Sequence, residues 1–535
     1  MKDLAEYRGI RKDFRLEVPE RFNYTLDVVG RQAATRPEAL ALLTVDNEGK
    51  ETGRYTFSEM ATRAHQAAHF LSALGVNKGD RVFVQLPRIV DWYDVLLGCF
   101  EIGAVPMPGT TLLTSRDIAY RLEAAGAKVA ITDDDGAARI DAIEPDPLTT
   151  KLVVGEGRPG WTAWDISSQP TSATSADPTA AHDPFLLYFT SGTTAHPKMV
   201  LHSHASYGLG HYLTARFWMD LGPSDLHWTV SDTGWAKAAW GVFGQWQLGA
   251  AVFQWNGAGK PDMDLILRMI GQHRITTFCA PPTLYRAFVQ LDLDQYDWSS
   301  LRHSMSAGEP LNPEVIATWK SHTGLYPYDG YGQTETVNLV ANFPGLAVKP
   351  GSMGLAVPGF DIEIVDDDGV ALPRGAEGHI AVRTEPRPVG LFQEYWKDSQ
   401  RNAEVFRNGW YYTGDRATMD DDGYIWFVGR ADDVIISAAY RIGPFEVESA
   451  LLEHPAVAEA AVVGKPDPER GQIVKAFVLL APGHEPSDGL AREIQDHVKG
   501  VTAPYKYPRE IEFVEELPKT ISGKIRRVEL REREQ

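Results

Sequence analysis

The chain has 535 residues, more than one ordinary hydrophobic core supports, so we expect at least two domains. With 43% hydrophobic and 23% charged residues it has the composition of a globular protein, and no apolar run approaches the roughly 20 residues that span a bilayer. The formal net charge of −20 disfavours nucleic acid as a partner, because phosphate backbones attract clustered Lys and Arg. Basic residues gather instead in the late segment 518–533, which suits an anionic small molecule.

The N-terminal segment 1–22 carries acids such as Asp3 and Glu6 and lacks the apolar core of a secretory signal. It also lacks the Arg-rich, acid-poor composition of a transit peptide, so we expect a cytoplasmic protein. Cys99 and Cys279 are too few for a disulfide framework or a cysteine metal cluster, and we expect both to be packing residues.

Residues 55–140 alternate helical and strand patterns. The apolar spacing predicts an amphipathic helix over 56–76, and short apolar runs at 81–86, 104–109 and 128–132 predict strands between Gly, Pro and Asp turns. This rhythm is typical of α/β layers with parallel strands. A surface connection rich in Ser, Thr, Ala and Pro follows at 165–184, before a predicted strand at 185–189.

The pattern changes twice towards the C-terminus. Strand patterns with charged turns from Phe360 predict a small β-rich subdomain, and about a hundred residues after Arg430 alternate helix and strand. The predicted fold class is therefore α/β. A large N-terminal domain over 1–430 contains α/β subdomains and the β-rich subdomain, and a small, mobile α+β C-terminal domain covers 431–535.

The run 188–198 places a strand-like stretch before a turn rich in hydroxyl groups and glycine that ends in Pro and Lys. Backbone N–H groups and hydroxyls of such a turn can close on phosphate oxygens, and a lysine adds a point charge. The spacing is not that of a P-loop, so the residues alone leave a plain polar turn as an open alternative. The candidate phosphate-binding residues are Thr190, Ser191, Gly192, Thr193, Thr194 and Lys198.

This run resembles the signature loop of the adenylate-forming superfamily, which includes acyl-CoA synthetases, luciferases and the adenylation domains of peptide synthetases. Ala195 stands where that loop usually has Gly. The other motifs of the superfamily follow in the expected order, at 306–310 (Ser-Ala-Gly-Glu-Pro), 329–335 (Asp-Gly-Tyr-Gly-Gln-Thr-Glu), 412–415 (Tyr-Thr-Gly-Asp), 429–434 and 518–527.

The resemblance implies roles for these residues around ATP. It places Gly308, Glu309 and Pro310 beside the adenine, and Asp329, Gly330, Tyr331, Gly332 and Gln333 along the nucleotide and acyl groups. It also implies that Asp415 binds the ribose hydroxyls and that Arg430 contacts ribose or phosphate. Thr334 would contact the α-phosphate and Glu335 would hold Mg²⁺, an ion that prefers oxygen ligands. The residues alone leave an alternative open for each acid: Glu335 as a solvated loop residue and Asp415 as an ordinary turn residue.

Two further positions concern movement and the chemical step. By resemblance, Asp432 is the hinge between the two domains, and Lys524 is the lysine that promotes adenylation. A cation that bridges the attacking carboxylate and the α-phosphate offsets the repulsion between the two anions. From position alone, Lys524 could equally be a solvated lysine of the tail.

The acceptor and the acid are indicated less directly. The segment 437–448 resembles the part of the family that faces CoA, with Ala439, Tyr440 and Arg441 along the pantetheine tunnel and Ala439 in place of the usual Gly. Segments 232–237, 466–471, 474–477 and 505–508 look like the medium-chain acyl-CoA synthetase subgroup. Trp235 is a candidate wall of the acyl pocket together with Gly332, although a core tryptophan is an equal alternative.

The resemblance therefore implies an AMP-forming acyl-CoA synthetase, an acid–thiol ligase that converts ATP, CoA and a short- or medium-chain carboxylate into acyl-CoA, AMP and pyrophosphate. Its cofactors and substrates would be ATP, Mg²⁺ and CoA. Three alternatives stay open: a methylthio-acid ligase of the 3-methylmercaptopropionate type, an adenylating enzyme with another acceptor, and a non-catalytic nucleotide sensor. The residues name no base for the CoA thiol, and a homo-oligomer remains open.

Overall fold

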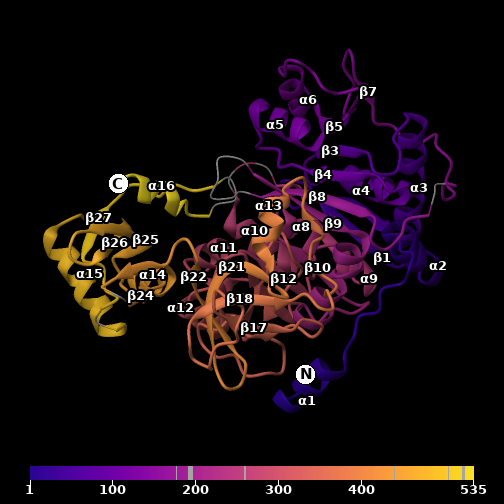
Figure 1. Cartoon of the computed structure of the whole chain (residues 1–535). Helices are drawn as coiled ribbons and strands as arrows, with labels where there is room; N and C mark the ends of the chain where they lie inside the picture. The colour runs from indigo at the N-terminus through magenta and orange to yellow at the C-terminus, as the bar shows by residue number, and fades with distance from the viewer. Residues whose placement is uncertain are drawn as a thin grey trace.

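The computed structural model describes residues 1–175, 178–190, 197–257, 259, 261–438, 440–503, 505–520 and 524–534. It has a large body and a smaller unit that holds the C-terminal elements, seen in yellow in Figure 1. The prediction of an α/β fold with a β-rich subdomain and a small C-terminal domain is confirmed. Cys99 and Cys279 are free and buried, as expected of packing residues. Among the described residues no helix is both long and apolar enough to cross a membrane.

A nine-stranded sheet forms the centre of the large body. Its order is β16-β15-β14-β13-β12-β10-β11-β1-β2, and the strands from β14 to β1 pair in parallel. Parallel strands end at a common edge, where loops of α/β folds build their sites. The bounds are β1 Leu40–Val45, β2 Glu51–Thr56, β10 Leu226–Thr229, β11 Ala251–Trp255, β12 Thr277–Ala280, β13 His303–Ala307, β14 Pro327–Tyr331, β15 Val340–Ala341 and β16 Leu355–Ala356.

A second, all-parallel sheet contains the strands predicted in the first third of the chain. Its order is β4-β3-β5-β6-β7, with β3 Arg81–Gln85, β4 Val105–Pro108, β5 Val129–Asp133, β6 Thr150–Val154 and β7 Thr162–Ala163. The predicted helix is α3 (Phe57–Ala73), which begins at a capping box between Thr56 and Glu59 and buries its apolar face against α4 (Val90–Ile102). Helices α5 (Ser115–Ala125) and α6 (Asp134–Asp141) follow.

A short antiparallel sheet carries the ends of the candidate phosphate loop. Strand β8 (Pro184–Thr190), the strand predicted at 185–189, pairs with β9 (Lys198–Ser203), and β19 (Glu394–Tyr395) pairs with the other edge of β9. The pairing of β19 brings residues from nearly 200 positions away against Lys198 and its neighbours. The helices next along the chain are α8 (Ala236–Trp240), α9 (Phe243–Gln247), α10 (Met263–Gln272), α11 (Pro282–Phe288) and α12 (Pro313–Thr323).

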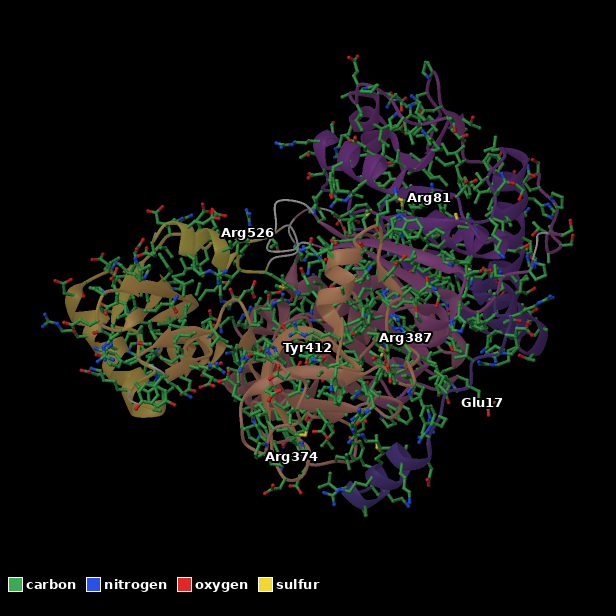
Figure 2. The ribbon with its side chains drawn as sticks, viewed as in Figure 1. Glu17, Arg81, Arg374, Arg387, Tyr412 and Arg526 are labelled. Atoms are coloured by element: carbon green, nitrogen blue, oxygen red, sulfur yellow. The ribbon has the colours of Figure 1, made fainter. Side chains whose placement is uncertain are left out.

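The β-rich subdomain is a sheet in the order β17-β18-β21-β20, with β22 paired to β21. Its bounds are β17 Ile362–Val365, β18 Gly378–Arg383, β20 Phe406–Arg407, β21 Trp410–Met419 and β22 Ile425–Arg430, with α13 (Ser399–Val405) before β20. Tyr412, in β21, is labelled within this sheet in Figure 2. Strand β21 carries Asp415 directly opposite Arg430 of β22.

The small unit is a sheet in the order β24-β23-β26-β25 with β27 beside β26, covered by helices. The elements are β23 Ile435–Ser437, β24 Tyr440–Ile442, α14 Pro444–Leu452, β25 Val457–Asp467, β26 Gly471–Leu480, α15 Asp488–Val501, β27 Glu510–Phe513 and α16 Arg527–Glu532. It has its own core of aliphatic side chains. The predicted boundary near Asp432 falls between β22 and β23, and it stays a prediction.

Candidate active site

Asp415 is the centre of a buried polar cluster that joins β14 to the β-rich subdomain. The Tyr331 hydroxyl and the Gln333 amide donate hydrogen bonds to Asp415 Oδ2 at 2.6 and 2.7 Å. Arg430 Nε lies 3.6 Å from Asp415 Oδ1 and 3.6 Å from the carboxylate of Asp432. Burial raises the pKa of Asp415, and the Arg430 charge opposes that shift. These residues, Tyr331, Gln333, Asp415 and Arg430, form the Asp415 cluster.

Glu335 lies next to the ends of the candidate phosphate loop. The Tyr395 hydroxyl donates to Glu335 Oε1 at 2.8 Å, and Lys198 Nζ lies 5.2 Å from the centre of the Tyr395 ring. Burial lowers the pKa of Lys198, while the Glu335 carboxylate acts in the opposite direction. Glu335 and Lys198, which the motifs place 137 positions apart, thus meet across the β9–β19 edge.

The residues expected beside the adenine lie where β13 and β14 end. Gly308 follows β13 with φ +112°, a backbone conformation that favours glycine. Glu309 pairs with Arg286 at 3.4 Å. Asp329 is buried in β14, and burial raises its pKa to about 8, so this carboxyl group is largely protonated at neutral pH. Pro310 follows in the same loop.

Two glycines of the 329–335 motif have no room for a side chain. A Cβ on Gly330 would lie 2.5 Å from the Trp218 ring, and one on Gly332 would lie 2.5 Å from the ring of Trp240. Trp240 is buried, whereas Trp235, at the start of the same short helix α8, is half-buried. The predicted wall residue Trp235 therefore keeps accessible surface, and Trp240 closes the space against Gly332.

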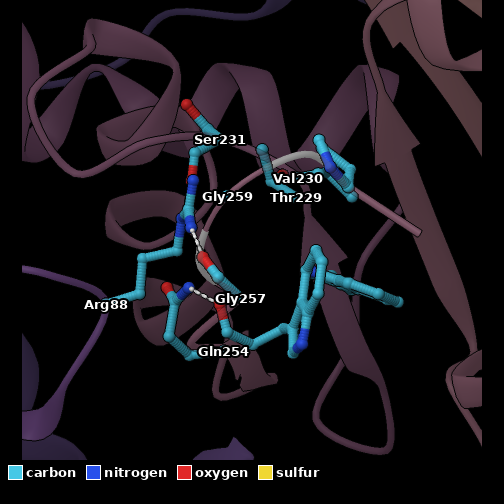
Figure 3. A pocket seen from close by; sticks show the side chains of 10 residues that line it. Arg88, Thr229, Val230, Ser231, Gln254, Gly257 and Gly259 are labelled. Carbon is cyan, nitrogen blue, oxygen red and sulfur yellow. Dashed lines mark hydrogen bonds between the residues drawn. The ribbon is translucent and has the colours of Figure 1, made fainter. Parts of the chain in front are cut away.

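The Arg88 side chain stabilises the segment that precedes Trp235. It lines a small cavity of about 70 Å³ at the ends of β10 and β11. In Figure 3 its guanidinium points to the Gly257 carbonyl, to which Nη1 donates at 2.7 Å, and its Nε donates to the Ser231 carbonyl at 2.8 Å. Because its donors serve backbone carbonyls, Arg88 holds the chain before Trp235 in place.

Lys524 lies at the base of a closed hairpin. Its N–H donates to the Thr520 hydroxyl at 3.1 Å, its carbonyl accepts from the Thr520 N–H at 2.7 Å, and Lys519 forms an antiparallel bridge with Ile525. The Lys524 side chain is exposed, yet its charge reaches the large body, where it contributes to a lowered pKa of Lys237 after burial. Lys524 thus lies within electrostatic range of the large body.

Several residues predicted for the site lie apart from the Asp415 cluster and Glu335, or outside the described residues. Tyr440 is 51% exposed and stacks on Tyr505 with ring centroids 4.2 Å apart, and Arg441 beside it is exposed. Figure 1 places their strand β24 at a different edge of the small unit from α16, which follows Lys524. Ser191, Gly192, Thr193, Thr194, Ala195 and Ala439 lie outside the described residues.

His202 holds the backbone at Thr334. Its Nε2 lies 2.7 Å from the Thr334 carbonyl, so that nitrogen carries the proton, and its ring stacks on Tyr207 with centroids 3.8 Å apart. Burial lowers its pKa to about 3. His202 is therefore a neutral structural residue, and His204, whose pKa burial also lowers to about 3, is equally enclosed.

Sequence reasoning missed Tyr395, Trp240 and Lys237. Tyr395 stands in no recognised motif, and only the β19–β9 pairing brings it to Glu335. Trp240 and Lys237 lie just after Trp235, and Lys237 was noted only as part of the segment 232–237. A charged residue on an otherwise apolar turn, Ala236 to Trp240, was the signal available for Lys237.

Comparison with known proteins identifies the family of the chain. Residues 29–396 match the family model of AMP-binding enzymes, and 446–524 match the model of the AMP-binding enzyme C-terminal domain. The chain is 47% identical to the acyl-coenzyme A synthetase ACSM3, mitochondrial, of Mus musculus, over 100% of this chain and 94% of that protein.

Two solved structures show the same fold. The anthranilate CoA ligase AuaEII, in complex with anthranoyl-AMP, has a TM-score of 0.88 and 33% identity, over 98% of both chains. A benzoate CoA ligase from Burkholderia xenovorans LB400 has a TM-score of 0.84 and 30% identity, over 95% of this chain and 100% of that one.

The fold and the matching family models define the class: the chain belongs to the family of AMP-binding enzymes. Within that family, its similarity to acyl-CoA synthetases over the full length makes it an AMP-forming acyl-CoA synthetase, with ATP, CoA and a carboxylic acid as substrates.

The expected cytoplasmic location is wrong. The curated relatives at 46 to 47% identity are named as mitochondrial proteins. The expectation used only residues 1–22, namely their acids, their missing apolar core and their lack of an Arg-rich, acid-poor composition. That local composition does not fix the compartment in which a folded enzyme works.

Proposed function

We propose that the protein joins a short- or medium-chain carboxylic acid to CoA in a single site built around the Asp415 cluster, Glu335 and Lys524. The observation that supports this proposal is the convergence of motif residues from distant parts of the chain. Tyr331 and Gln333 contact Asp415 directly, and Glu335 faces Lys198 across Tyr395.

In the first half-reaction, a carboxylate oxygen of the acid attacks the α-phosphorus of ATP, and the bond to pyrophosphate breaks. Lys524 places a positive charge between the two anions and offsets their repulsion. Asp415 accepts the ribose O–H groups, since its carboxylate is buried and held by Tyr331 and Gln333. Thr334 contacts the α-phosphate, and the turn after Thr190 with Lys198 holds the other phosphates.

Glu335 is the residue that would hold Mg²⁺. It is one buried carboxylate, 8% exposed, fixed by the Tyr395 hydroxyl, and a single protein carboxylate with substrate phosphates is a usual Mg²⁺ ligand set. The described residues contain no group of three or more His, Cys, Asp or Glu side chains that could hold a metal. When bound, Mg²⁺ would neutralise phosphate charge.

In the second half-reaction, the CoA sulfur attacks the acyl carbonyl carbon, and the bond to AMP breaks. Lys524 occupies the approach to the adenylate, so the small domain has to rotate about Asp432 first and bring Ala439, Tyr440 and Arg441 to the site. Tyr440 and Arg441 are exposed, as expected of residues that contact the site only after this rotation. Trp235 and the close contact between Trp240 and Gly332 limit the acyl chain to short or medium length.

The test is AMP and acyl-CoA formation with Mg·ATP, CoA and a panel of acids from acetate to decanoate, including branched, aromatic and methylthio acids. We expect AMP and acyl-CoA together, with an optimum among short or medium acids. Lys524→Ala should slow adenylation about 100-fold or more, because a positioned charge contributes most in the transition state. Thioester formation from supplied acyl-adenylate should change only a few-fold.

Lys519→Ala is the matched control, since Lys519 lies in the same hairpin but pairs with Glu459 at 2.8 Å. It should keep both half-reactions. Pyrophosphate release without a thioester would mean an acceptor other than CoA, and no pyrophosphate with any acid would refute the proposed reaction.

A further inference from the structure

Lys237 is a cation inside the large body, at the end of the central parallel strands. It belongs to helix α8, two residues after Trp235, and its Nζ donates to the Ala307 carbonyl at 2.5 Å. A Cβ built on Gly308 would lie 3.7 Å from the same Nζ. Lys237 therefore stands between the candidate acyl wall and the loop expected beside the adenine.

The charge of Lys237 has little compensation from its surroundings. An ammonium group has three N–H donors, and within the described part of the chain one of them has an acceptor and no carboxylate lies within ion-pair distance. Burial lowers the pKa of Lys237, and the charge of Lys524 adds to that effect. A largely buried cation without a carboxylate partner is costly, and such groups cluster at functional sites.

Each acidic neighbour of Lys237 is neutral or engaged elsewhere. Burial raises the pKa of Asp329 to about 8, so it is mostly protonated at neutral pH. Burial also raises the pKa of the Cys279 thiol. Glu309 is paired with Arg286 at 3.4 Å. None of the three therefore neutralises Lys237 in the way that two or three carboxylates neutralise Lys349 and Lys475.

The turn that carries Lys237 also keeps accessible surface. Trp235, Ala236, Lys237 and Ala238 are all partly accessible, although Gly234 before them and Ala239 after them are buried. The accessible part of this turn lies beside the Ala307–Gly308 backbone, where the ammonium group donates its hydrogen bond.

We propose that Lys237 is a specificity-determining residue whose ammonium group binds a hydrogen-bond-accepting oxygen on the acyl chain, so that the preferred substrates are oxygen-substituted short acids. This inference rests on the proposed function and names its substrate class. A site built to donate hydrogen bonds to a substrate oxygen discriminates strongly against the analogue without that oxygen, because the donors of the site are then left unpaired.

The test uses pairs of acids with the same shape: 4-oxopentanoate with 4-methylpentanoate, and 3-hydroxybutanoate with 3-methylbutanoate. For the unaltered protein we expect kcat/KM to be at least about 10-fold higher for the oxygen-bearing member of one or both pairs. Lys237→Met keeps the length of the side chain and removes the charge. It should lose that preference, so that the kcat/KM ratio of each pair approaches one.

Lys349→Met is the matched control, since Lys349 already pairs with Asp420 and Asp422 and lies in no candidate site. It should leave both ratios unchanged. Equal use of both members by the unaltered protein, or an equal loss for all four acids in Lys237→Met, would overturn the inference while leaving the CoA ligase activity intact. If none of the four acids yields acyl-CoA, while other acids do, the inference also fails; if no acid of any kind does, the proposed function fails instead.

Discussion

Asp415 is buried, and both donors on its Oδ2 come from one motif, 329–335. Asp415→Asn replaces the charged acceptor with a neutral amide, whose one carbonyl oxygen can face either Tyr331 and Gln333 or the ribose, while its NH₂ group can accept from neither. Hydrogen bonds to charged groups contribute about 1.5–3 kcal/mol. We therefore expect the KM for ATP to rise about 10- to 100-fold, with the KM for the acid within about 2-fold, measured by steady-state kinetics.

Asp367→Asn provides the control for this change. Asp367 is an exposed carboxylate that accepts a hydrogen bond from His379 at the surface of the β-rich subdomain. Its substitution should leave the KM for ATP unaltered. If Asp415→Asn behaves in the same way, Asp415 does not bind the nucleotide.

At the scale of elements, helix α16 holds the lysine hairpin against the small domain. Arg527 forms a bidentate contact with Glu448 of α14, whose carboxylate is 7% exposed, and Arg531 pairs with Asp433 beside the predicted hinge. Leu530, between them, is fully buried. Because Lys524 lies only three residues before this helix, the pairs of α16 fix the position from which Lys524 reaches the large body.

Arg527→Met should therefore affect more than stability. It leaves the Glu448 carboxylate buried without its partner, which costs about 3 kcal/mol, and the thermal midpoint of the small domain should fall. Adenylation, measured by ATP–pyrophosphate exchange, should slow about 10-fold or more, with a smaller effect on thioester formation from supplied acyl-adenylate. Arg526, labelled in Figure 2, is the control: its side chain is 51% exposed and, within the described part of the chain, forms an ion pair with Glu529 alone. Equal effects of Arg526→Met and Arg527→Met would contradict this view of α16.

The helices and strands were largely predictable from the sequence, whereas the contacts between residues of distant elements were not. Helix α3 follows from the helical spacing of its apolar residues and strand β8 from a continuous apolar run, because each signal lies in consecutive residues. Asp415 and Glu335 were found through motifs. Tyr395 could not be found, because its contact with Glu335 depends on which strand pairs with the open edge of β9. Lys237 depends likewise on the parallel order of β12, β13 and β14, which sets its neighbours.

At the scale of the whole molecule, the use of one site for two half-reactions requires the small unit to move relative to the large body. Direct contact between the small unit and the large body includes the hydrogen bond from Asn312 to Ser449, at 3.3 Å. Asp432 lies two residues after the end of β22, its carboxylate is 39% exposed, and Arg430 Nε lies 3.6 Å from that carboxylate. A residue that is exposed, lies between two sheets and has one weak ion pair can change its backbone angles at small cost.

Asp432→Pro should separate the two half-reactions. Proline fixes φ near −65° and also restricts the residue before it, so rotation at this position becomes costly. We expect ATP–pyrophosphate exchange to stay within about 3-fold, because Lys524 already faces the large body, and acyl-CoA formation to fall at least about 10-fold. Asp432→Ala removes the same ion pair but leaves the backbone free, so it should keep both activities. If the proline variant loses both half-reactions equally, or neither, the rotation takes place elsewhere in the chain, and the boundary near Asp432 has to be moved.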